Sequence, residues 1–329
     1  MTLDTQRMAE IYADSQLSAA GFHSSSLTEL QLPVVQVAEA PGNVQVPYAV
    51  FGDRDAPRLV FAISPYGCRV DDESQMVRLE AQQKALGNDA CIVGLHVYEP
   101  GRLELSAHER RMIAGGSFRP YADRVLSVIE AVDPHDDQEI ILYGFSMGAD
   151  VSVDTAYRMT SDPQRGIRSV ERLAAIEPAR SQKRGALAVV RAFATSGDDL
   201  YDNVMASRSP ALLEARGIDQ ADPRAKKKHD AQVTKDVVRG NLRDIRGNIA
   251  NIRGFATDES LSQLNAMIQG DVLPIALVGR MTESPVCAQD FMDALLPSDN
   301  LRTFEAEGDH SLADNVSKSA AFAVRAVLF

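Results

Sequence analysis

The chain has 329 residues, of which 45% are hydrophobic and 24% are charged. This composition is typical of a globular protein with a large buried core. A net charge of −12 excludes general nucleic-acid binding, because most of the surface would repel phosphate. No apolar run approaches the roughly 20 residues of a membrane-crossing helix, and the first residues lack the features of a signal peptide. We therefore expect a cytoplasmic protein without stable membrane insertion.

The first 29 residues are expected to form an N-terminal helical extension, because apolar side chains recur there at helical spacing. Two strand-like runs follow, Leu30–Val37 and Val44–Phe51, joined by a turn at Pro41-Gly42-Asn43. Both runs contain a proline, which an edge strand tolerates. They predict an antiparallel pair at one edge of a sheet.

Beyond residue 57, apolar runs alternate with helical patterns. The runs are residues 58–63, 90–97, 139–143, 170–176, 272–278 and 301–304. The helical patterns lie near residues 73–86, 105–132, 147–160, 287–296 and 312–328. Continuous apolar strands separated by helices predict an α/β protein whose mostly parallel central sheet has helices on both faces. The core would comprise residues 30–178 and 271–329.

Residues 179–270 interrupt this alternation and predict an inserted helical lid. The clearest helical pattern is Lys235–Gly254, where Val238, Leu242, Ile245, Ile249 and Ile252 form a stripe that should be buried. Arg-Gly pairs recur every seven residues along the same stretch, at 239–240, 246–247 and 253–254. These glycines either permit close approach of another backbone or break the helix.

The insertion is also the basic part of the chain. Residues 181–254 contain fourteen Lys or Arg against nine Asp or Glu. A solvated helical face is the simpler interpretation, and attraction of an anionic substrate is the alternative.

The run Gly144-Phe145-Ser146-Met147-Gly148 carries the main chemical signal. A buried strand leads into it and a helical pattern follows, so Ser146 would lie on a sharp strand-to-helix turn. Glycines two residues away on either side let neighbouring chains pass closely, and the helix N-terminus favours developing negative charge. We predict that Ser146 is a catalytic nucleophile.

From about residue 30 onward the chain resembles the α/β-hydrolase superfamily, which implies the order Ser, acid, His along the sequence. A histidine should therefore follow the last strand, and His310 in Gly308-Asp309-His310-Ser311 satisfies this condition. The resemblance assigns His310 as the base.

The acid has more than one candidate. The resemblance places it after the penultimate strand, where Glu283 stands in the loop that follows residues 275–278. Glutamate can hold the imidazole tautomer as aspartate does. Glu177, at the end of the strand 170–176, is the alternative, and Asp290 is a further candidate. We predict Glu283.

The oxyanion formed during acyl transfer needs two N–H donors. By resemblance they are the N–H of Met147, directly after the nucleophile, and one from the loop Ser64-Pro65-Tyr66. Proline has no N–H, so Tyr66 is the predicted second donor.

Neither a metal nor a cofactor is expected. The chain has no His-Glu-x-x-His motif, no paired Cys/His set and no phosphate-binding loop. Cys68, Cys91 and Cys287 are an odd, widely spaced set that fits thiols in a reducing compartment.

The resemblance implies a serine hydrolase that cleaves a carboxylic ester or related small acyl substrate through an acyl-enzyme. Two alternatives remain open: a thioesterase or acyltransferase acting on a carrier-bound acyl group, and an inactive hydrolase-fold binding protein. The sequence does not specify the oligomeric state.

Overall fold

The computed structural model describes residues 33–161, 169–195, 200–207, 209–311 and 315–328. The N-terminal helix expected within residues 1–29 and the first residues of the expected strand 30–37 lie outside these ranges.

The described strands form one eight-stranded sheet in the order β1-β2-β4-β3-β5-β6-β7-β8. Their bounds are β1 Gln36–Ala40, β2 Val44–Phe51, β3 Arg58–Ile63, β4 Ala90–Leu95, β5 Glu139–Phe145, β6 Arg172–Ile176, β7 Ile275–Met281 and β8 Leu301–Ala306. Strands β3 to β8 run parallel, whereas β2 is antiparallel to both β1 and β4. The predicted mostly parallel sheet with an antiparallel pair at its edge is confirmed.

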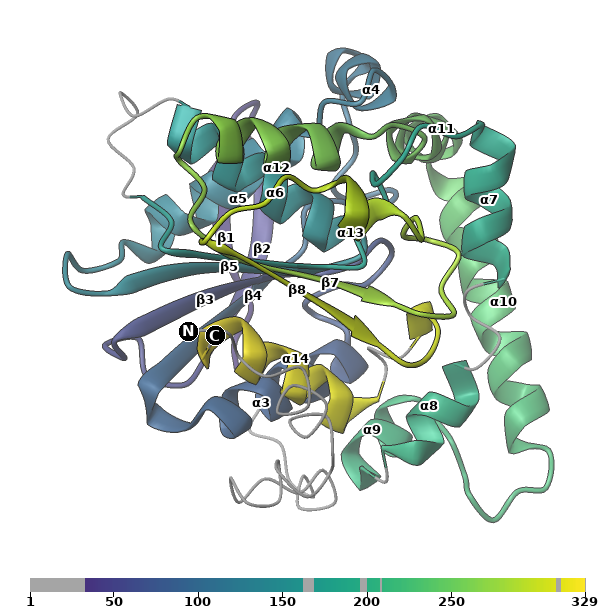
Figure 1. Ribbon diagram of the computed structural model, residues 1–329. Helices are drawn as coiled ribbons and strands as arrows, with labels where there is room; N and C mark the ends of the chain where they lie inside the picture. The colour runs from purple at the N-terminus through teal and green to yellow at the C-terminus, as the bar shows by residue number, and fades with distance from the viewer. Residues whose placement is uncertain (1–32, 162–168, 196–199, 208, 312–314, 329) are drawn as a thin grey trace.

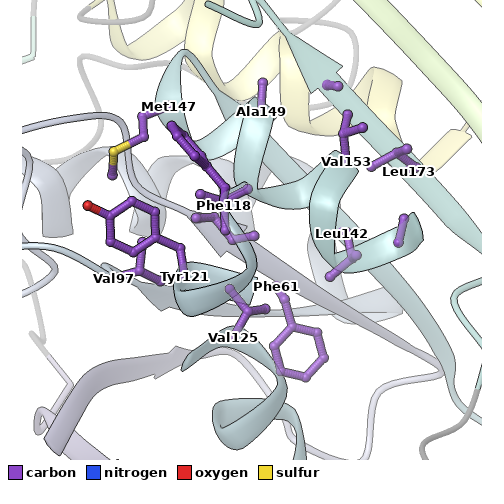
Figure 2. Packing of buried hydrophobic residues seen from close by; sticks show 14 of the residues in the cluster. Phe61, Val97, Phe118, Tyr121, Val125, Leu142, Met147, Ala149, Val153 and Leu173 are labelled. Carbon is purple, nitrogen blue, oxygen red and sulfur yellow. The ribbon is translucent and has the colours of Figure 1, made fainter. Parts of the chain in front are cut away.

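Helices cover both faces of this sheet (Figure 1). α3 (Glu73–Leu86) and α14 (Val316–Leu328) lie on one face, and α5 (Arg119–Val132) and α6 (Met147–Ser161) lie on the other. Alternate side chains of β3 supply the two cores: Phe61 packs toward α5 and α6, whereas Val60 packs toward α3 and α14. Figure 2 shows Phe61 and Leu142 facing Val125 of α5 and Val153 of α6.

Two predicted helices are corrected by the structure. The pattern at residues 105–132 is split into α4 (Ala107–Ala114) and α5, because the chain turns at Gly115-Gly116. Gly116 has a φ of +97°, a backbone conformation that is strained for any residue with a side chain. The pattern at 287–296 contains only the single turn α13 (Phe291–Ala294). A 3-10 turn, η2 (Gly87–Asp89), connects α3 to β4.

All described elements between β6 and β7 are helices. They are α7 (Ala186–Thr195), α8 (Leu200–Ala206), α9 (Pro210–Ala215), α10 (Ala225–Arg243), α11 (Ile245–Phe255) and α12 (Glu259–Gln269). α8 and α9 pack with α3 and α14 below the sheet, and α12 packs on α6 above it (Figure 1). This helical insertion therefore passes beside the carboxyl ends of the parallel strands, where α7 and α10 lie.

The helical stretch predicted over Lys235–Gly254 is divided between α10 and α11, and the division falls at Asp244 rather than at one of the glycines. α10 ends at Arg243, and Asp244 caps α11 by accepting a hydrogen bond from Gly247 N–H at 2.8 Å. The predicted buried stripe is wrong, because Leu242, Ile245 and Ile249 are exposed. Close approach by glycines and hydrogen bonding by asparagines determine which face of α11 is buried; that face carries Gly247, Asn248, Ala250, Asn251 and Gly254.

Within the described part of the chain, no helix combines the length and apolar character that crossing a bilayer requires.

Candidate active site

Ser146 occupies the turn between β5 and α6. Its φ is +57°, a left-handed conformation that is strained for a residue with a side chain. Two backbone hydrogen bonds hold it there: Ser146 N–H donates to Ile176 O at 2.9 Å, and Ala149 N–H donates to Ser146 O at 2.9 Å. The first bond anchors the nucleophile turn to the end of β6, and the second begins α6.

The two glycines of the motif are required by backbone contacts. A Cβ on Gly144 would lie 2.1 Å from the carbonyl group of Gly148. A Cβ on Gly148 would lie 2.1 Å from Ile63 O at the end of β3. Since backbone atoms cannot move aside as a flexible side chain can, only glycine fits either position. This is the close passage of chains that the motif predicts.

His310 joins the serine to a carboxylate. Its Nε2 lies 2.9 Å from Ser146 Oγ, and its Nδ1 lies 3.2 Å from Glu177 Oε2. An Nδ1–H directed at the carboxylate leaves the Nε2 lone pair facing the hydroxyl, which is the tautomer a general base needs. Ser146 is only 1% exposed, and Glu177 is fully buried.

The carboxylate beside His310 is Glu177, the alternative candidate, and not Glu283. Glu177 follows β6 directly, its φ is +57°, and its Oε1 accepts a hydrogen bond from Met281 N–H. Glu283 is exposed and contributes its backbone N–H, which donates to Gly308 O at 2.9 Å in the histidine loop. Asp290 is exposed at the N-terminus of α13.

The sheet order explains this correction. β6 pairs directly with β5, so the residue after Ile176 emerges beside Ser146, whereas Glu283 follows the next strand, β7. The sequence does carry one signal for Glu177: it directly follows β6, which is the next strand along the chain after β5.

A buried ionic cluster, which the sequence reasoning missed, fixes the chain just after Glu177. The carboxylate of Asp150 in α6 accepts N–H bonds from Ala179 and Arg180, at 3.1 and 3.0 Å, and a hydroxyl bond from Ser260 of α12 at 2.8 Å. The Arg180 guanidinium lies 3.5 Å from Asp154. Burial raises the pKa of Asp150 to about 6. The segment leaving the acid is therefore tied to both α6 and α12.

The predicted oxyanion donors lie near the turn. Met147 is the first residue of α6, and the close contact of Gly148 with Ile63 brings the loop Ser64-Pro65-Tyr66 beside it. Ser64 Oγ is buried without a hydrogen-bond partner among the described residues. The Tyr66 hydroxyl donates to Asn248 of α11, so the Tyr66 side chain joins the core to the insertion. Its N–H as an oxyanion donor remains a prediction.

Five aromatic rings form a closed circuit beneath α11, with neighbouring centroids 5.4 to 6.1 Å apart. In order around the circuit they are Phe255, Tyr66, Tyr98, Tyr121 and Phe118. Phe193 of α7 connects the circuit to His310, because its ring lies 5.4 Å from Phe255 and 5.9 Å from His310. Figure 2 shows the Tyr121 ring beside Met147, the residue that follows Ser146.

The buried face of α11 is hydrogen-bonded to this circuit. Tyr98 OH donates to Asn248 Oδ1 at 2.9 Å, and Tyr121 OH donates to Asn251 Oδ1 at 2.7 Å. Burial, with the charge of nearby Asp244, raises the pKa of Tyr66 above its ordinary value. Tyrosine hydroxyls of the core thus hold α11 in place, and one of them belongs to the loop Ser64-Pro65-Tyr66.

His96, which the strand pattern places near the sheet end, is a buried structural residue. Its Nδ1 accepts from Val70 N–H at 3.0 Å, and its Nε2 lies 3.3 Å from Glu99. Among the residues that the structure describes, no group of three His, Cys, Asp or Glu side chains is placed to hold a metal ion.

Solved structures show the same arrangement of elements. An esterase from Thermogutta terrifontis matches with a TM-score of 0.55 over 89% of this chain and 97% of its own, at 13% identity. The chain has the α/β-hydrolase fold. The Cif epoxide hydrolase from Acinetobacter nosocomialis also matches, with a TM-score of 0.55 over 100% of this chain and 98% of its own, at 9% identity. A bromoperoxidase from Bacillus anthracis matches with a TM-score of 0.55 over 90% of this chain and 99% of its own, at 13% identity.

No protein-family model and no curated protein matches the sequence. At identities this low the structural matches establish the α/β-hydrolase fold, and the chemistry must be argued from the site.

Proposed function

We propose that this chain is a serine hydrolase that cleaves a carboxylic ester or a related small acyl substrate. One observation carries the proposal: the two ring nitrogens of His310 face Ser146 Oγ and Glu177 Oε2. A hydroxyl at its ordinary pKa is a weak nucleophile, and this arrangement supplies both the base and the group that orients it.

In the proposed reaction, Ser146 Oγ attacks the acyl carbon while His310 Nε2 takes the hydroxyl proton. Glu177 stabilises the imidazolium, and the N–H groups of Met147 and Tyr66 receive the oxyanion. Collapse of the tetrahedral intermediate breaks the ester bond, and the leaving alkoxide takes the proton from His310. Water then attacks the acyl-enzyme by the same steps and releases the acid.

The buried cysteines Cys91 and Cys287 are free thiols, which fits a reducing compartment, so we place this reaction in the cytoplasm. The inactive-scaffold alternative requires the site to have lost its base or acid. Here His310 is within hydrogen-bonding distance of both Ser146 and the buried carboxylate of Glu177, so we favour an active enzyme.

Covalent labelling with a fluorophosphonate probe tests the proposal. The wild type should label, and Ser146→Ala and His310→Ala should not. Ser152→Ala, in the same helix as Ser146, is the matched control and should label as the wild type does. In turnover of aryl esters, Ser146→Ala should lower kcat by about 10⁴ to 10⁶. A folded wild type that neither labels nor hydrolyses esters would refute the proposal, and faster turnover of acyl-thioesters would reassign it to thioester chemistry.

A further inference from the structure

The helix α11 is inverted relative to an ordinary surface helix. Its polar residues Asn248 and Asn251 are buried, whereas Ile245 and Ile249 are 53% and 47% exposed. A surface helix normally buries its apolar stripe and exposes its polar face. The buried polar face is explained by the tyrosine hydroxyls beneath it. Among the residues that the structure describes, no contact explains the exposed isoleucines.

A neighbouring helix, α7, also exposes apolar side chains. α7 packs on α11 through Phe193 and Phe255. Val189 of α7 is fully buried, whereas Leu187 and Val190 on its other side are 82% and 44% exposed. We call the exposed side chains of the pair, together with the adjoining end of α10, the outer surface. It consists of Leu187, Val190, Leu242, Ile245 and Ile249.

The two helices that supply most of the outer surface carry basic side chains and no acidic ones. Neither α7 nor α11 contains an Asp or Glu, although the whole chain carries 46 acidic residues and a net charge of −12. Arg191 of α7 and Arg246 and Arg253 of α11 are exposed, as is Arg243 at the end of α10. An apolar face bordered by guanidinium groups complements a partner that is apolar and anionic.

A second copy of this chain does not meet that requirement. A symmetric dimer through the outer surface would bring the arginines of each copy together, and like charges oppose association. The five apolar side chains of the outer surface are all aliphatic, whereas Trp and Tyr are enriched among the residues that dominate protein–protein binding and Leu and Val are under-represented. Aliphatic side chains with basic neighbours suit the boundary between lipid headgroups and acyl chains.

We propose that the outer surface of α7 and α11 binds peripherally to anionic lipid bilayers. The aliphatic side chains enter the headgroup boundary, and the surrounding arginines contact anionic headgroups. This binding requires no catalysis, so it is measured apart from the proposed hydrolase activity. The same α11 is held over the oxyanion loop by Tyr66, which places the roof of the active site against the lipid.

Vesicle flotation with the full chain tests the proposal. Vesicles of phosphatidylcholine containing about one quarter phosphatidylglycerol should retain the wild type at low ionic strength and release it at high salt. Pure phosphatidylcholine should bind at least about tenfold less.

Three double variants locate the surface. Ile245→Ser/Ile249→Ser should lower partition onto anionic vesicles at least about tenfold through lost apolar insertion. Arg246→Gln/Arg253→Gln should lower it by a similar factor, about tenfold, and reduce its salt dependence. Val272→Ser/Ile275→Ser removes exposed apolar side chains elsewhere on the molecule and should bind as the wild type does.

Four outcomes overturn the proposal. The wild type floats with neither vesicle, or it binds both vesicles equally. The isoleucine double variant binds as the wild type does, which places the contact on another surface. Sedimentation equilibrium shows a wild-type dimer that Ile245→Ser/Ile249→Ser dissociates, which assigns the outer surface to a second copy.

Discussion

Ser146 lies between two regions that are built in different ways. On the sheet side, the turn from β5 to α6 is fixed by backbone contacts: Gly148 against Ile63 O, and Ser146 N–H on Ile176 O. On the side of the helical insertion, α11 is held by side chains, with tyrosines of the core donating to Asn248 and Asn251. The backbone contacts on the sheet side depend on the path of the chain. The side-chain hydrogen bonds on the insertion side depend on which residue types occupy positions far apart in the sequence.

This difference matters for what each region tolerates. Backbone atoms cannot withdraw from an added methyl group without moving a strand, so the sheet side accepts few substitutions. A side chain can rotate away from an added group, so a substitution on the insertion side should lower the free energy of unfolding only moderately. Substitutions on the sheet side should therefore cost more than matched substitutions on the insertion side.

Exchange of the acid has the largest expected effect. Glu177→Gln keeps an acceptor for Met281 N–H but removes the charge that stabilises the imidazolium, so kcat should fall by about 10⁴. The matched variant Glu283→Gln alters an exposed side chain and should change kcat less than about threefold. Steady-state turnover of an aryl ester measures both. The reverse ranking would show that Glu177 has only a structural role.

Glycine substitutions compare the two sides directly. In Gly148→Ala the new Cβ meets the backbone oxygen of Ile63, so unfolding free energy should fall by more than about 3 kcal/mol. In Gly247→Ala the nearest atoms belong to the side chains of Asp244 and Tyr98, which can rotate away at a cost of about 1 to 2 kcal/mol. Urea unfolding measures both losses. Equal losses would remove the distinction between backbone and side-chain contacts.

The pH dependence of stability tests the anchor behind the acid. Burial raises the pKa of Asp150 from 3.8 to about 6. The folded state therefore binds a proton more tightly than the unfolded state does, and the stability linked to this proton is present at low pH and lost as pH rises through about 6. Relative to Asp150→Asn, the wild type should gain about 2 kcal/mol between pH 7.5 and 4.5. Asp150→Asn has no titrating group at position 150, so the contributions of all other groups cancel in the difference between the two proteins. A stability difference that does not change with pH would contradict the raised pKa of Asp150.

Removal of one tyrosine hydroxyl should have the smallest effect. Tyr66→Phe deletes a hydrogen bond to Asn248, which still accepts from Tyr98, so we expect a loss of about 1 kcal/mol. Hydrogen exchange should show faster opening of α11, whereas Tyr48→Phe, which deletes a bond to Gln36 at the sheet edge, should leave α11 unchanged. Slower exchange, or an equal effect of both variants, would contradict the role of Tyr66 as a tie to α11.

The parts of the fold that sequence patterns predicted are those with local physical signals. The alternation of buried strands and helices needs only a short window, and β2, for example, has the bounds expected for it. The nucleophile turn is equally local, because glycine, serine and glycine must stand two residues apart. His310 was found by its order after the last strand, and the structure brings it to Ser146.

The parts that sequence patterns misassigned depend on contacts between distant residues. Glu283 and Glu177 both follow strands, and only the pairing of β5 with β6 shows which carboxylate emerges beside His310. Ile245 and Ile249 of α11 have the spacing of a buried face. They are exposed because Asn248 and Asn251 meet tyrosines more than a hundred residues earlier in the chain. Periodicity counts apolar residues and does not detect such pairs.

The near-complete burial of Ser146 also constrains the kinetics. An acyl carbon must come within about 3 Å of the Ser146 hydroxyl oxygen before attack. Ser146 is 1% exposed, so we expect that neighbouring residues must move before a substrate reaches this oxygen. Entry of the substrate into the site then becomes a separate step that precedes bond formation. The rate of covalent labelling should rise with probe concentration to a ceiling set by this opening, and probes of unequal intrinsic reactivity should share the same ceiling.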